Sequence, residues 1–548
     1  MTQETIYTRR DPKIFMFDDG RHAGTLYQME PPLTPEDLTF NVDLLVDSGA
    51  DTLFYHVGLE GGVVLYDSKV APKWGENVAK WKHPVWYRAS RNIKSLIDQG
   101  HDPLNLLCER AHQKGIWFIA TNWVGFEGGD RETSGGLGRK SDFVYDNPQF
   151  QVGPEDDSSS KHVSPERFSF LHPEVREKRF VIFEELLAQY TTDGIELNLT
   201  DLAPLCKFSE VDTLAPIMTQ WIQDLRDVAI SSQKSQGRKK RIFVRIPAHP
   251  DAWSMFGYDV RTWVEKNLVD GLICMPDMSH STPGNSELDQ HMDLSQAVDL
   301  VNGSNCRVFY GLRNIIGRDL KQYATPQMTW AAAANAYSQG AHGFGVAEAM
   351  WSPNGWPWTS EEYDTLRILG HPEMLAIADK LYRVRSAKKS VPPTDYHWIP
   401  GVSPTLPKML EVDQPVDIDF RISDDVSRWN DLGRVESVRL RVRITSIEPS
   451  LNEIEIYFND ALLPDQLLKL NDSTFRILKH GAVGPYGHFY EYLLTSDYYP
   501  NIGNNSVKVV WVKADTEVEF GGGVMVYDVD CEIKYRRHRN FEENPVDY

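Results

Sequence analysis

The stretch TTDGIELNLTD, residues 191 to 201, decides the fold of the first part of the chain. After an Asp-Gly pair, the apolar residues Ile195, Leu197 and Leu199 alternate with Glu196 and Asn198. This alternation predicts a buried β-strand. A carboxylate inside such a strand costs free energy unless it has a partner or a task, so Glu196 is a candidate functional residue.

Seven further β-rich runs resemble this stretch, and each is followed by an amphipathic segment. They cover residues 13 to 20, 51 to 58, 116 to 124, 241 to 248, 269 to 277, 306 to 314 and 341 to 351. Eight consecutive β/α pairs fit a closed parallel barrel better than an open sheet. No glycine-rich phosphate turn of the dinucleotide type follows an early strand. We therefore expect an α/β fold with a (β/α)8 TIM barrel over residues 1–390 as the catalytic domain.

The pattern changes after about residue 390. Runs such as SVRLRVRITSI and NSVKVVWVKA alternate apolar and polar residues with a period of two and are joined by Pro, Gly and Asn turns. They predict an antiparallel β-sandwich over residues 406–548, after a linker at 391–405. This accessory domain could bind glycan, or it could pack on the barrel and provide a homo-oligomer contact. We favour the structural or interface role.

The bulk composition limits the class of protein. A formal net charge of -21 argues against nucleic acid as a partner, because phosphate binding needs clustered Lys and Arg. Five scattered cysteines indicate neither a disulfide framework nor a zinc site. The first residues lack the apolar core of a signal peptide, and no apolar run approaches the length of a membrane span. We expect a cytoplasmic protein without a membrane partner, unless a secretory signal was trimmed.

Polar residues cluster near the ends of the predicted strands, where barrels of this kind place their active sites. Such residues suit a pocket for a hydroxyl-rich ligand, and the tryptophans of the long loops suit the faces of sugar rings. Glu196 and Asp277 are the predicted catalytic carboxylate pair, since two acids about 5 to 9.5 Å apart are what glycoside hydrolysis requires. The predicted substrate-binding residues are Asp18, Asp19, His56, Asn122, Trp123, Asn198, Asp201, Arg245, Arg313, Glu348 and Trp351.

Several of these residues also have a structural interpretation. By strand alternation, Glu196 and Asn198 point into the barrel, with Asn198 facing the pocket and Glu196 one layer deeper. Glu196 could then be a structural carboxylate paired with Arg245 on the next strand. Asp201 could be a helix N-cap.

Two other acids have similar alternatives. Glu348 could pair with Arg313 instead of contacting a ligand. Asp19 and Gly20 could form only a turn.

The residues 10 to 385 resemble the bacterial glycosyl-hydrolase-like barrel proteins of the family-ten-like hydrolase group. The similar segments are SFLHPEVREKRF followed by DGIEL, then VRIP, YDVRTWVEKNLVDGLICMP, YGLRN and TPQMTWAAAANAYSQGAHGFGV. The resemblance implies a (β/α)8 fold and a carbohydrate ligand. In the nearer relatives an acid often stands at the position of Asn198, so the resemblance also leaves a loss of activity open.

The fourth strand also resembles the chitinase pattern D-G-x-D-x-D-x-E. In this sequence Glu196 and Asn198 take the places of the second and third acids, but Thr200 stands where the catalytic Glu belongs. This departure removes the chitinase mechanism. Fold similarity alone does not give a function.

The sequence therefore predicts a glycoside hydrolase that acts on a small oligosaccharide without a cofactor or metal. The two arginines Arg245 and Arg313 suggest an anionic sugar, a uronate or a sulfated unit, because guanidinium groups bind such anions in a bidentate manner. A non-catalytic carbohydrate-binding barrel is the first alternative. A metal-dependent hydrolase using His56, Asp18 and Asp277 is the second, although no H-x-H or H-E-x-x-H spacing is present.

Overall fold

The computed structural model describes most of the chain. The described residues are 11–18, 20, 25–155, 163–276, 288–313, 315–316, 322–346, 359–384, 406–472, 487–514, 517 and 523–536.

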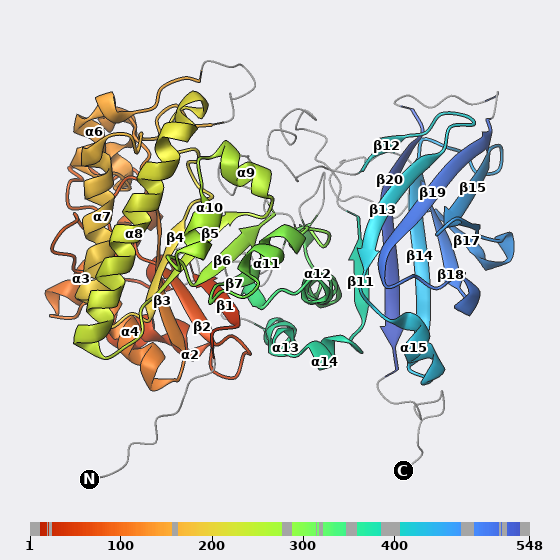
Figure 1. Cartoon of the computed structure of the whole chain (residues 1–548), viewed down its shortest axis with the longest axis horizontal. Helices are drawn as coiled ribbons and strands as arrows, with labels where there is room; N and C mark the ends of the chain where they lie inside the picture. The colour runs from red at the N-terminus through yellow and green to blue at the C-terminus, as the bar shows by residue number, and fades with distance from the viewer. Residues whose placement is uncertain are drawn as a thin grey trace, which may run out of the picture.

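The first part of the chain is a closed parallel barrel in which the strands follow one another in the order β1-β10-β7-β6-β5-β4-β3-β2 (Figure 1). The predicted TIM barrel and its eight strands are confirmed. Their bounds are β1 (Ile14–Asp18), β2 (Thr52–His56), β3 (Trp117–Trp123), β4 (Gly194–Asn198), β5 (Arg241–Pro247), β6 (Gly271–Met275), β7 (Arg307–Leu312) and β10 (Gly343–Val346). A short hairpin of β8 (Ile315–Ile316) and β9 (Gln322–Tyr323) follows β7.

Helices surround the barrel, and several begin at residues that the sequence marks clearly. Thr34 caps the first turn of α2 by accepting a hydrogen bond from the Asp37 amide, and Pro35 occupies the first helical position. The barrel helices are α1 (Thr25–Gln28), α2 (Pro35–Asp43), α3 (Pro84–Asp98), α4 (Pro103–Gln113), α5 (Arg131–Ser134), α6 (Asp142–Asp146), α7 (Pro173–Ala188), α8 (Val211–Gln236), α9 (Pro250–Met255), α10 (Val260–Glu265), α11 (Ser295–Val301), α12 (Pro326–Ser338), α13 (Ser360–Leu369) and α14 (Pro372–Leu375). In the part of the chain that the structure describes, none of the helices is both long and apolar enough to cross a membrane.

The interior of the barrel is filled by a cluster that we call the phenylalanine plug. Phe15 lies at the centre, with its ring centroid 4.5 Å from Phe54, 4.4 Å from Phe309 and 5.4 Å from Phe243. The plug consists of Phe15, Phe17, Phe54, Ile119, Phe243, Ile273, Met275 and Phe309. Residues that alternate with these point outward into a second core between strands and helices. The barrel is thus closed by side chains and is not a pore.

Gly194 allows β4 to enter the barrel beside β5. A Cβ atom at this position would lie 2.1 Å from the carbonyl oxygen of Arg241, and the backbone φ angle is +153°. A larger residue would push the two strands apart, so the Asp-Gly pair that opens the strand is a requirement of the pairing between β4 and β5.

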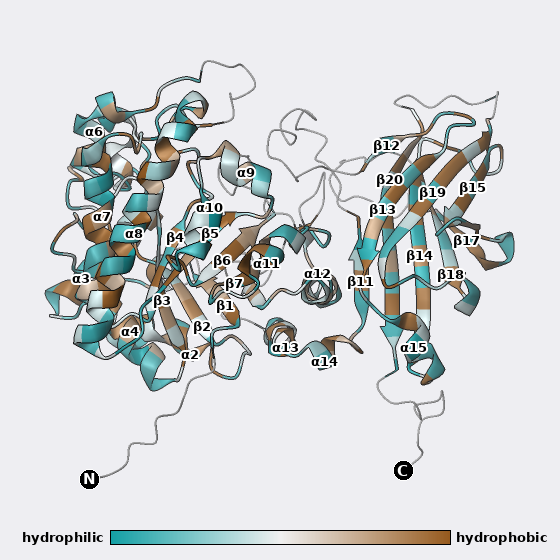
Figure 2. Ribbon diagram, viewed as in Figure 1, coloured by the Kyte–Doolittle hydropathy of each residue, from teal (hydrophilic) through white to brown (hydrophobic). Residues whose placement is uncertain are grey.

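The second part of the chain contains two antiparallel sheets that form the predicted β-sandwich. Figure 2 shows alternating hydrophobic and hydrophilic residues along its strands. One sheet has the order β11-β20-β14-β18-β17, with β12 also paired to β20, and the other has the order β13-β19-β15-β16. The elements are β11 (Lys380–Arg383), β12 (Lys408–Met409), β13 (Val416–Ile422), α15 (Val426–Asp431), β14 (Val435–Thr445), β15 (Glu453–Phe458), β16 (Ala461–Leu462), β17 (Leu468–Asp472), β18 (Gly487–Leu494), β19 (Gly503–Lys513) and β20 (Met525–Tyr535).

The larger sheet takes its edge strand from the range 1–390 that we predicted for the barrel. β11 pairs antiparallel with β20, Tyr382 opposite Cys531, so these residues belong structurally to the sandwich. The predicted linker, 391–405, lies outside the described residues.

The barrel covers one open side of the sandwich, where each sheet ends in an edge strand. The barrel helix α12 packs along β11 and also contacts β13 (Figure 1). An edge strand exposes unpaired backbone groups, and here barrel side chains bind them. Gln290 donates a hydrogen bond to the carbonyl oxygen of Leu381 (2.9 Å) and accepts one from the amide of Arg383 (2.5 Å).

His291 and Asn335 also bind main-chain groups of the edge strands, and together they reach both sheets. The Arg421 amide donates to Nδ1 of His291 (3.1 Å), so Nε2 carries the proton and donates to the Arg383 carbonyl (3.0 Å). Asn335 donates to the Arg421 carbonyl (3.0 Å). These buried bonds join the two domains through main-chain groups of the sandwich.

Candidate functional site

The strands end in a layer of polar side chains above the phenylalanine plug. On β2, His56 follows Phe54 by two residues, and on β5, Arg245 follows Phe243 by two, so both point to the interior side. The same alternation places the other members of the layer, and every one of them is buried. We call the mouth of the barrel that this layer occupies the carboxyl-terminal mouth; its inward-facing polar residues are His56, Thr121, Glu196, Asn198, Arg245 and Arg313, with Trp123 beside them.

Glu196 and Arg245 form an ion pair at the base of this layer. Nε of Arg245 lies 2.6 Å from Oε1 of Glu196, and Nη2 lies 3.0 Å from Oε2. Thr121, opposite Glu196 in the β3–β4 register, donates a further hydrogen bond to Oε2. The guanidinium of Arg245 also stacks over Phe17, 3.9 Å from the ring centroid. Glu196 is fully buried, and the pairing with Arg245 that we considered from the sequence is present.

The segment that follows β4 carries a second carboxylate of this mouth, that of Asp201. The side-chain amide of Asn198 donates to Oδ2 of Asp201 (2.7 Å), while its oxygen accepts from the amide (3.1 Å) and hydroxyl (2.9 Å) of Thr200. Leu202 has a φ angle of +62°, an unusual value for a residue with a side chain. Asp201 is thus held by Asn198 on a tightly turned segment, and it does not cap a described helix.

His56 and Trp123 lie together on the β2–β3 side of the mouth. Their ring centroids are 5.0 Å apart with an interplanar angle of 69°. Trp123 is 5% exposed and His56 6% exposed, so only small parts of the two rings reach the surface. An indole and an imidazole in this position offer an apolar face and a polar edge to a ligand.

Two residues that we expected in the pocket face away from it. Asp18 alternates with Phe17 and lies beside Tyr55, whose side chain belongs to the outer core. The amide of Gly20 donates to Asp18 (2.8 Å), and burial raises the pKa of Asp18 to about 6.

Asn122 alternates with Thr121 in the same way and contacts Gly58, where a Cβ atom would come within 2.8 Å of its amide group. Its side-chain nitrogen has no hydrogen-bond partner among the described residues. The strand periodicity explains both placements: a polar residue near a strand end faces the pocket only if it shares the phase of the inward phenylalanines.

Four candidate residues, Asp19, Asp277, Glu348 and Trp351, lie outside the described residues, so the carboxylate pair of Glu196 and Asp277 stays a prediction. Within the described ranges, no three His, Cys, Asp or Glu side chains come close enough to hold a metal ion. His56 and Asp18, named for the metal-dependent alternative, lie on opposite faces of the barrel wall.

The sequence did not point to Thr121, Arg167, Arg179 or Tyr258, although all four support the mouth. Thr121 meets Glu196 only through the register of two strands, which no local pattern encodes. Tyr258 donates to the carbonyl of Leu199 (2.9 Å) from a segment far along the chain. Alternation of β3 would have indicated that Thr121 faces inward.

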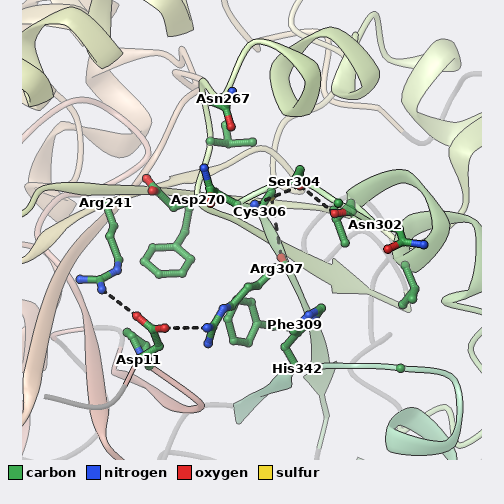
Figure 3. Close-up of a pocket in the computed structure, with 18 of the residues that line it drawn as sticks. Asp11, Arg241, Asn267, Asp270, Asn302, Ser304, Cys306, Arg307, Phe309 and His342 are labelled. Carbon is green, nitrogen blue, oxygen red and sulfur yellow. Dashed lines mark hydrogen bonds and ion pairs between the residues drawn. The ribbon is translucent and has the colours of Figure 1, made fainter. Parts of the chain in front are cut away.

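A hollow of about 810 Å³ lies at the other end of the barrel, which we call the amino-terminal mouth (Figure 3). Asp11 lies there between two arginines, 3.1 Å from Arg241 and 2.5 Å from Arg307. Asp270, also on its wall, is bound by Arg226 at 2.6 Å. Four charged side chains on the wall of this hollow, Asp11, Arg241, Asp270 and Arg307, are thus engaged in ion pairs.

No family model and no curated protein matches the chain. Among solved structures, the endo-β-1,4-mannanase from Thermotoga petrophila has a TM-score of 0.40 and 11% identity, over 95% of this chain and 97% of that chain. The PgaB (BpsB) glycoside hydrolase domain from Bordetella bronchiseptica has a TM-score of 0.39 and 14% identity, over 65% of this chain and 98% of that chain.

A third solved structure is larger than this chain. The cycloisomaltooligosaccharide glucanotransferase of Paenibacillus sp. has a TM-score of 0.34 and 10% identity over 95% of this chain, which spans 57% of that protein. Similarities at this level do not tell which activity, if any, this chain has.

Proposed function

We propose that the chain is a glycoside hydrolase that binds a small oligosaccharide at the carboxyl-terminal mouth of the barrel. The observation that supports the proposal best is the inward-facing polar layer above the phenylalanine plug, where a carboxylate, an amide, an imidazole and two guanidinium groups converge. Barrels of this fold place their active sites at this end, and hydroxyl-rich ligands need such groups beside an apolar ring face.

Glu196 acts in this proposal as the ionised carboxylate. Arg245 and Thr121 donate hydrogen bonds to this carboxylate that fix its orientation. Such a carboxylate can attack the anomeric carbon or accept a proton from the attacking water. The partner acid, for which Asp277 is our candidate, protonates the glycosidic oxygen as the bond to the leaving sugar breaks.

The other groups of the mouth bind the sugar. Trp123 provides an apolar face, while His56 and Asn198 meet hydroxyl groups. A uronate or sulfate group would be met by Arg313, which faces the same mouth as the Glu196–Arg245 pair. The preference for an anionic sugar therefore depends mainly on Arg313.

A screen of aryl glycosides and of neutral, uronate and sulfated oligosaccharides tests the proposal. We expect hydrolysis of at least one class, a loss of at least about 1000-fold in kcat/KM for Glu196→Gln, and a similar loss for Asp277→Asn. Asp11→Asn, at the amino-terminal mouth, is the matched control and keeps wild-type turnover. If Glu196→Gln and Asp277→Asn both kept wild-type turnover, the assignment of the pair would be wrong.

One observation favours a second function, that of a non-catalytic carbohydrate-binding barrel. Glu196 is fully buried and accepts three hydrogen bonds, as expected of a carboxylate that only holds the mouth together. Isothermal titration with the same saccharides separates the two functions. Binding without any release of reducing sugar by the wild-type protein would establish the second function and reject the first.

A further inference from the structure

Arg167 lies in the long segment between β3 and α7 and is completely buried. Nε donates to the carbonyl of Pro204 (2.7 Å), and Nη2 donates to the carbonyl of Cys206 (3.0 Å). Nη1 donates to the carbonyl of Ser164 (2.8 Å). The carboxylate of Glu155 binds Nη2 and also accepts from the amide of Phe208 (3.3 Å). Arg167 therefore spans from its own segment to residues 204–206.

Residues 204–206 are the end of the turned segment that carries Asp201. Each of three further contacts fixes this segment: the Phe170 amide donates to the Leu205 carbonyl (2.7 Å), Tyr258 binds the Leu199 carbonyl, and Leu202 packs on Gly125. A Cβ atom on Gly125 would lie 3.0 Å from Cβ of Leu202, which shows how closely the two backbones approach.

Arg179 on α7 holds the other side of this contact. It too is completely buried, and it donates to the carbonyls of Val124 (3.2 Å) and Gly125 (2.9 Å) while stacking 3.8 Å from the ring centroid of Phe126. The residues it binds directly follow Trp123. Two buried guanidinium groups thus bind backbone carbonyls on both sides of the contact between Gly125 and Leu202.

Burying a guanidinium is costly, and an apolar side chain of similar volume often stabilises a core equally well. Burial lowers the pKa of both arginines, to about 9 for Arg179. A guanidinium group, however, has several hydrogen-bond donors in a fixed geometry. It can therefore fix the conformation of a backbone segment that lies outside helices and strands.

We propose that Arg167 and Arg179 are positioning residues that fix the segments after β3 and β4, and with them Trp123 and Asp201, at the carboxyl-terminal mouth. The inference rests on the proposed function only where it concerns turnover. The claim that these arginines fix the backbone does not depend on the ligand or on the proposed function.

Hydrogen–deuterium exchange on the full-length protein tests the fixation without any ligand. In Arg167→Met we expect the amides of residues 199–206 to exchange at least about 10-fold faster, while those of β5 and β6 stay protected. Arg226→Met is the control, because Arg226, like Arg167, binds both main chain and a carboxylate, the carbonyl of Leu268 (2.9 Å) and Asp270 (2.6 Å), but near the amino-terminal mouth. It should leave residues 199–206 unchanged. Wild-type exchange of this segment in Arg167→Met would overturn the proposal.

Arg167→Lys and Glu155→Gln complete the test. A lysine side chain at this position would reach fewer of the carbonyls, so Arg167→Lys should lie between the wild type and Arg167→Met in exchange rate. If Arg167→Met does not fold, Glu155→Gln decides: faster exchange at residues 199–206 than in the wild type supports the proposal, and unchanged exchange overturns it.

Kinetics on a saccharide that the wild type hydrolyses provide the second readout. We expect Arg167→Met to lower kcat at least about 10-fold with a smaller change in KM, Arg167→Lys to recover part of the loss, and Arg226→Met to keep both constants. Equal losses in Arg167→Met and Arg226→Met would indicate a merely structural role and overturn the positioning claim. If the wild type hydrolyses no saccharide, the proposed hydrolase function fails, but the exchange result still decides the fixation.

Discussion

The two mouths of the barrel differ in how far their ion pairs are exposed to solvent. At the amino-terminal mouth, Asp11 bridges Arg241 and Arg307 at the rim of a wide hollow, and its side chain is 48% exposed. At the carboxyl-terminal mouth, Glu196 and Arg245 pair with almost no contact with water, with side chains 0% and 10% exposed. The first kind of pair contributes little to stability, whereas the second is costly to form and costlier to break.

The difference teaches that the volume of a hollow and the concentration of buried polar side chains single out opposite ends of this barrel. The amino-terminal mouth is roomy, but ion pairs of Asp11 with Arg241 and Arg307, and of Asp270 with Arg226, engage several of its charged groups. The carboxyl-terminal mouth concentrates buried polar side chains, the unusual backbone of Leu202 and two buried arginines that hold main-chain carbonyls. Such costly features cluster at functional sites.

The largest effect on stability is expected from breaking the ion pair between Glu196 and Arg245. Glu196→Gln leaves the charge of Arg245 buried without a counter-charge, so the free energy of unfolding should fall by about 3 to 5 kcal/mol. Urea denaturation at pH 7 measures it. The double variant Glu196→Gln, Arg245→Met should recover much of the loss, because no uncompensated charge remains; a loss below about 1 kcal/mol in the single variant would show that water reaches the pair.

The next effect concerns Asp18, just behind the carboxyl-terminal mouth. Burial raises its pKa to about 6 in the folded protein, above the ordinary value of 3.8, so the folded state binds the proton more tightly than the unfolded state. The stability that this group contributes is present at low pH and is lost as pH rises from about 4 through 6, by up to about 3 kcal/mol.

Asp18→Asn removes this dependence. The variant should gain stability relative to the wild type between pH 4 and pH 7, as measured by urea denaturation at both values. Asp98→Asn, which changes an exposed carboxylate on α3, serves as the control and should show no such trend. A wild type and an Asp18→Asn variant with parallel pH profiles would contradict the burial of the charged form.

A smaller effect is expected from Tyr258→Phe. The variant loses the hydrogen bond to the Leu199 carbonyl and leaves that oxygen buried, at a cost of about 1 to 1.5 kcal/mol in the free energy of unfolding. The loss should appear together with faster amide exchange in residues 199–206. A uniform change across the barrel would argue that Tyr258 supports only the core.

The smallest effect is expected at the amino-terminal mouth. Asp11→Asn weakens two partly exposed ion pairs, so the free energy of unfolding should change by less than about 1 kcal/mol, and the change should shrink further in about 0.5 M salt. Urea denaturation at two salt concentrations measures it. A loss comparable with that of Glu196→Gln would remove the contrast between the two mouths.

Much of the fold could be predicted from the sequence, because the period of apolar residues differs between strands and helices, and helical segments no longer follow the strands after about residue 390. The eight β/α units and the change of pattern after about residue 390 follow from that period alone. The inward direction of Glu196 and Asn198 followed from it as well.

The candidate site was less predictable for two physical reasons. Proximity to a strand end does not say which face a side chain occupies: in IFMFD, the inward phase belongs to Phe15 and Phe17, so Asp18 points outward. Contacts such as Thr121 with Glu196, or Arg167 with Pro204, depend on strand register and loop packing between distant segments. No local pattern in the sequence encodes these distances.

Ligand-induced protection from hydrogen–deuterium exchange tests the central claim most directly. The protein is measured with and without a saccharide identified in the screen or by titration. We predict slower exchange in residues 56–58, 121–125 and 198–206 at the carboxyl-terminal mouth, with no change in residues 240–242, 268–272 and 303–308 around the hollow. Protection confined to the second set would place the ligand at the amino-terminal mouth and contradict the account.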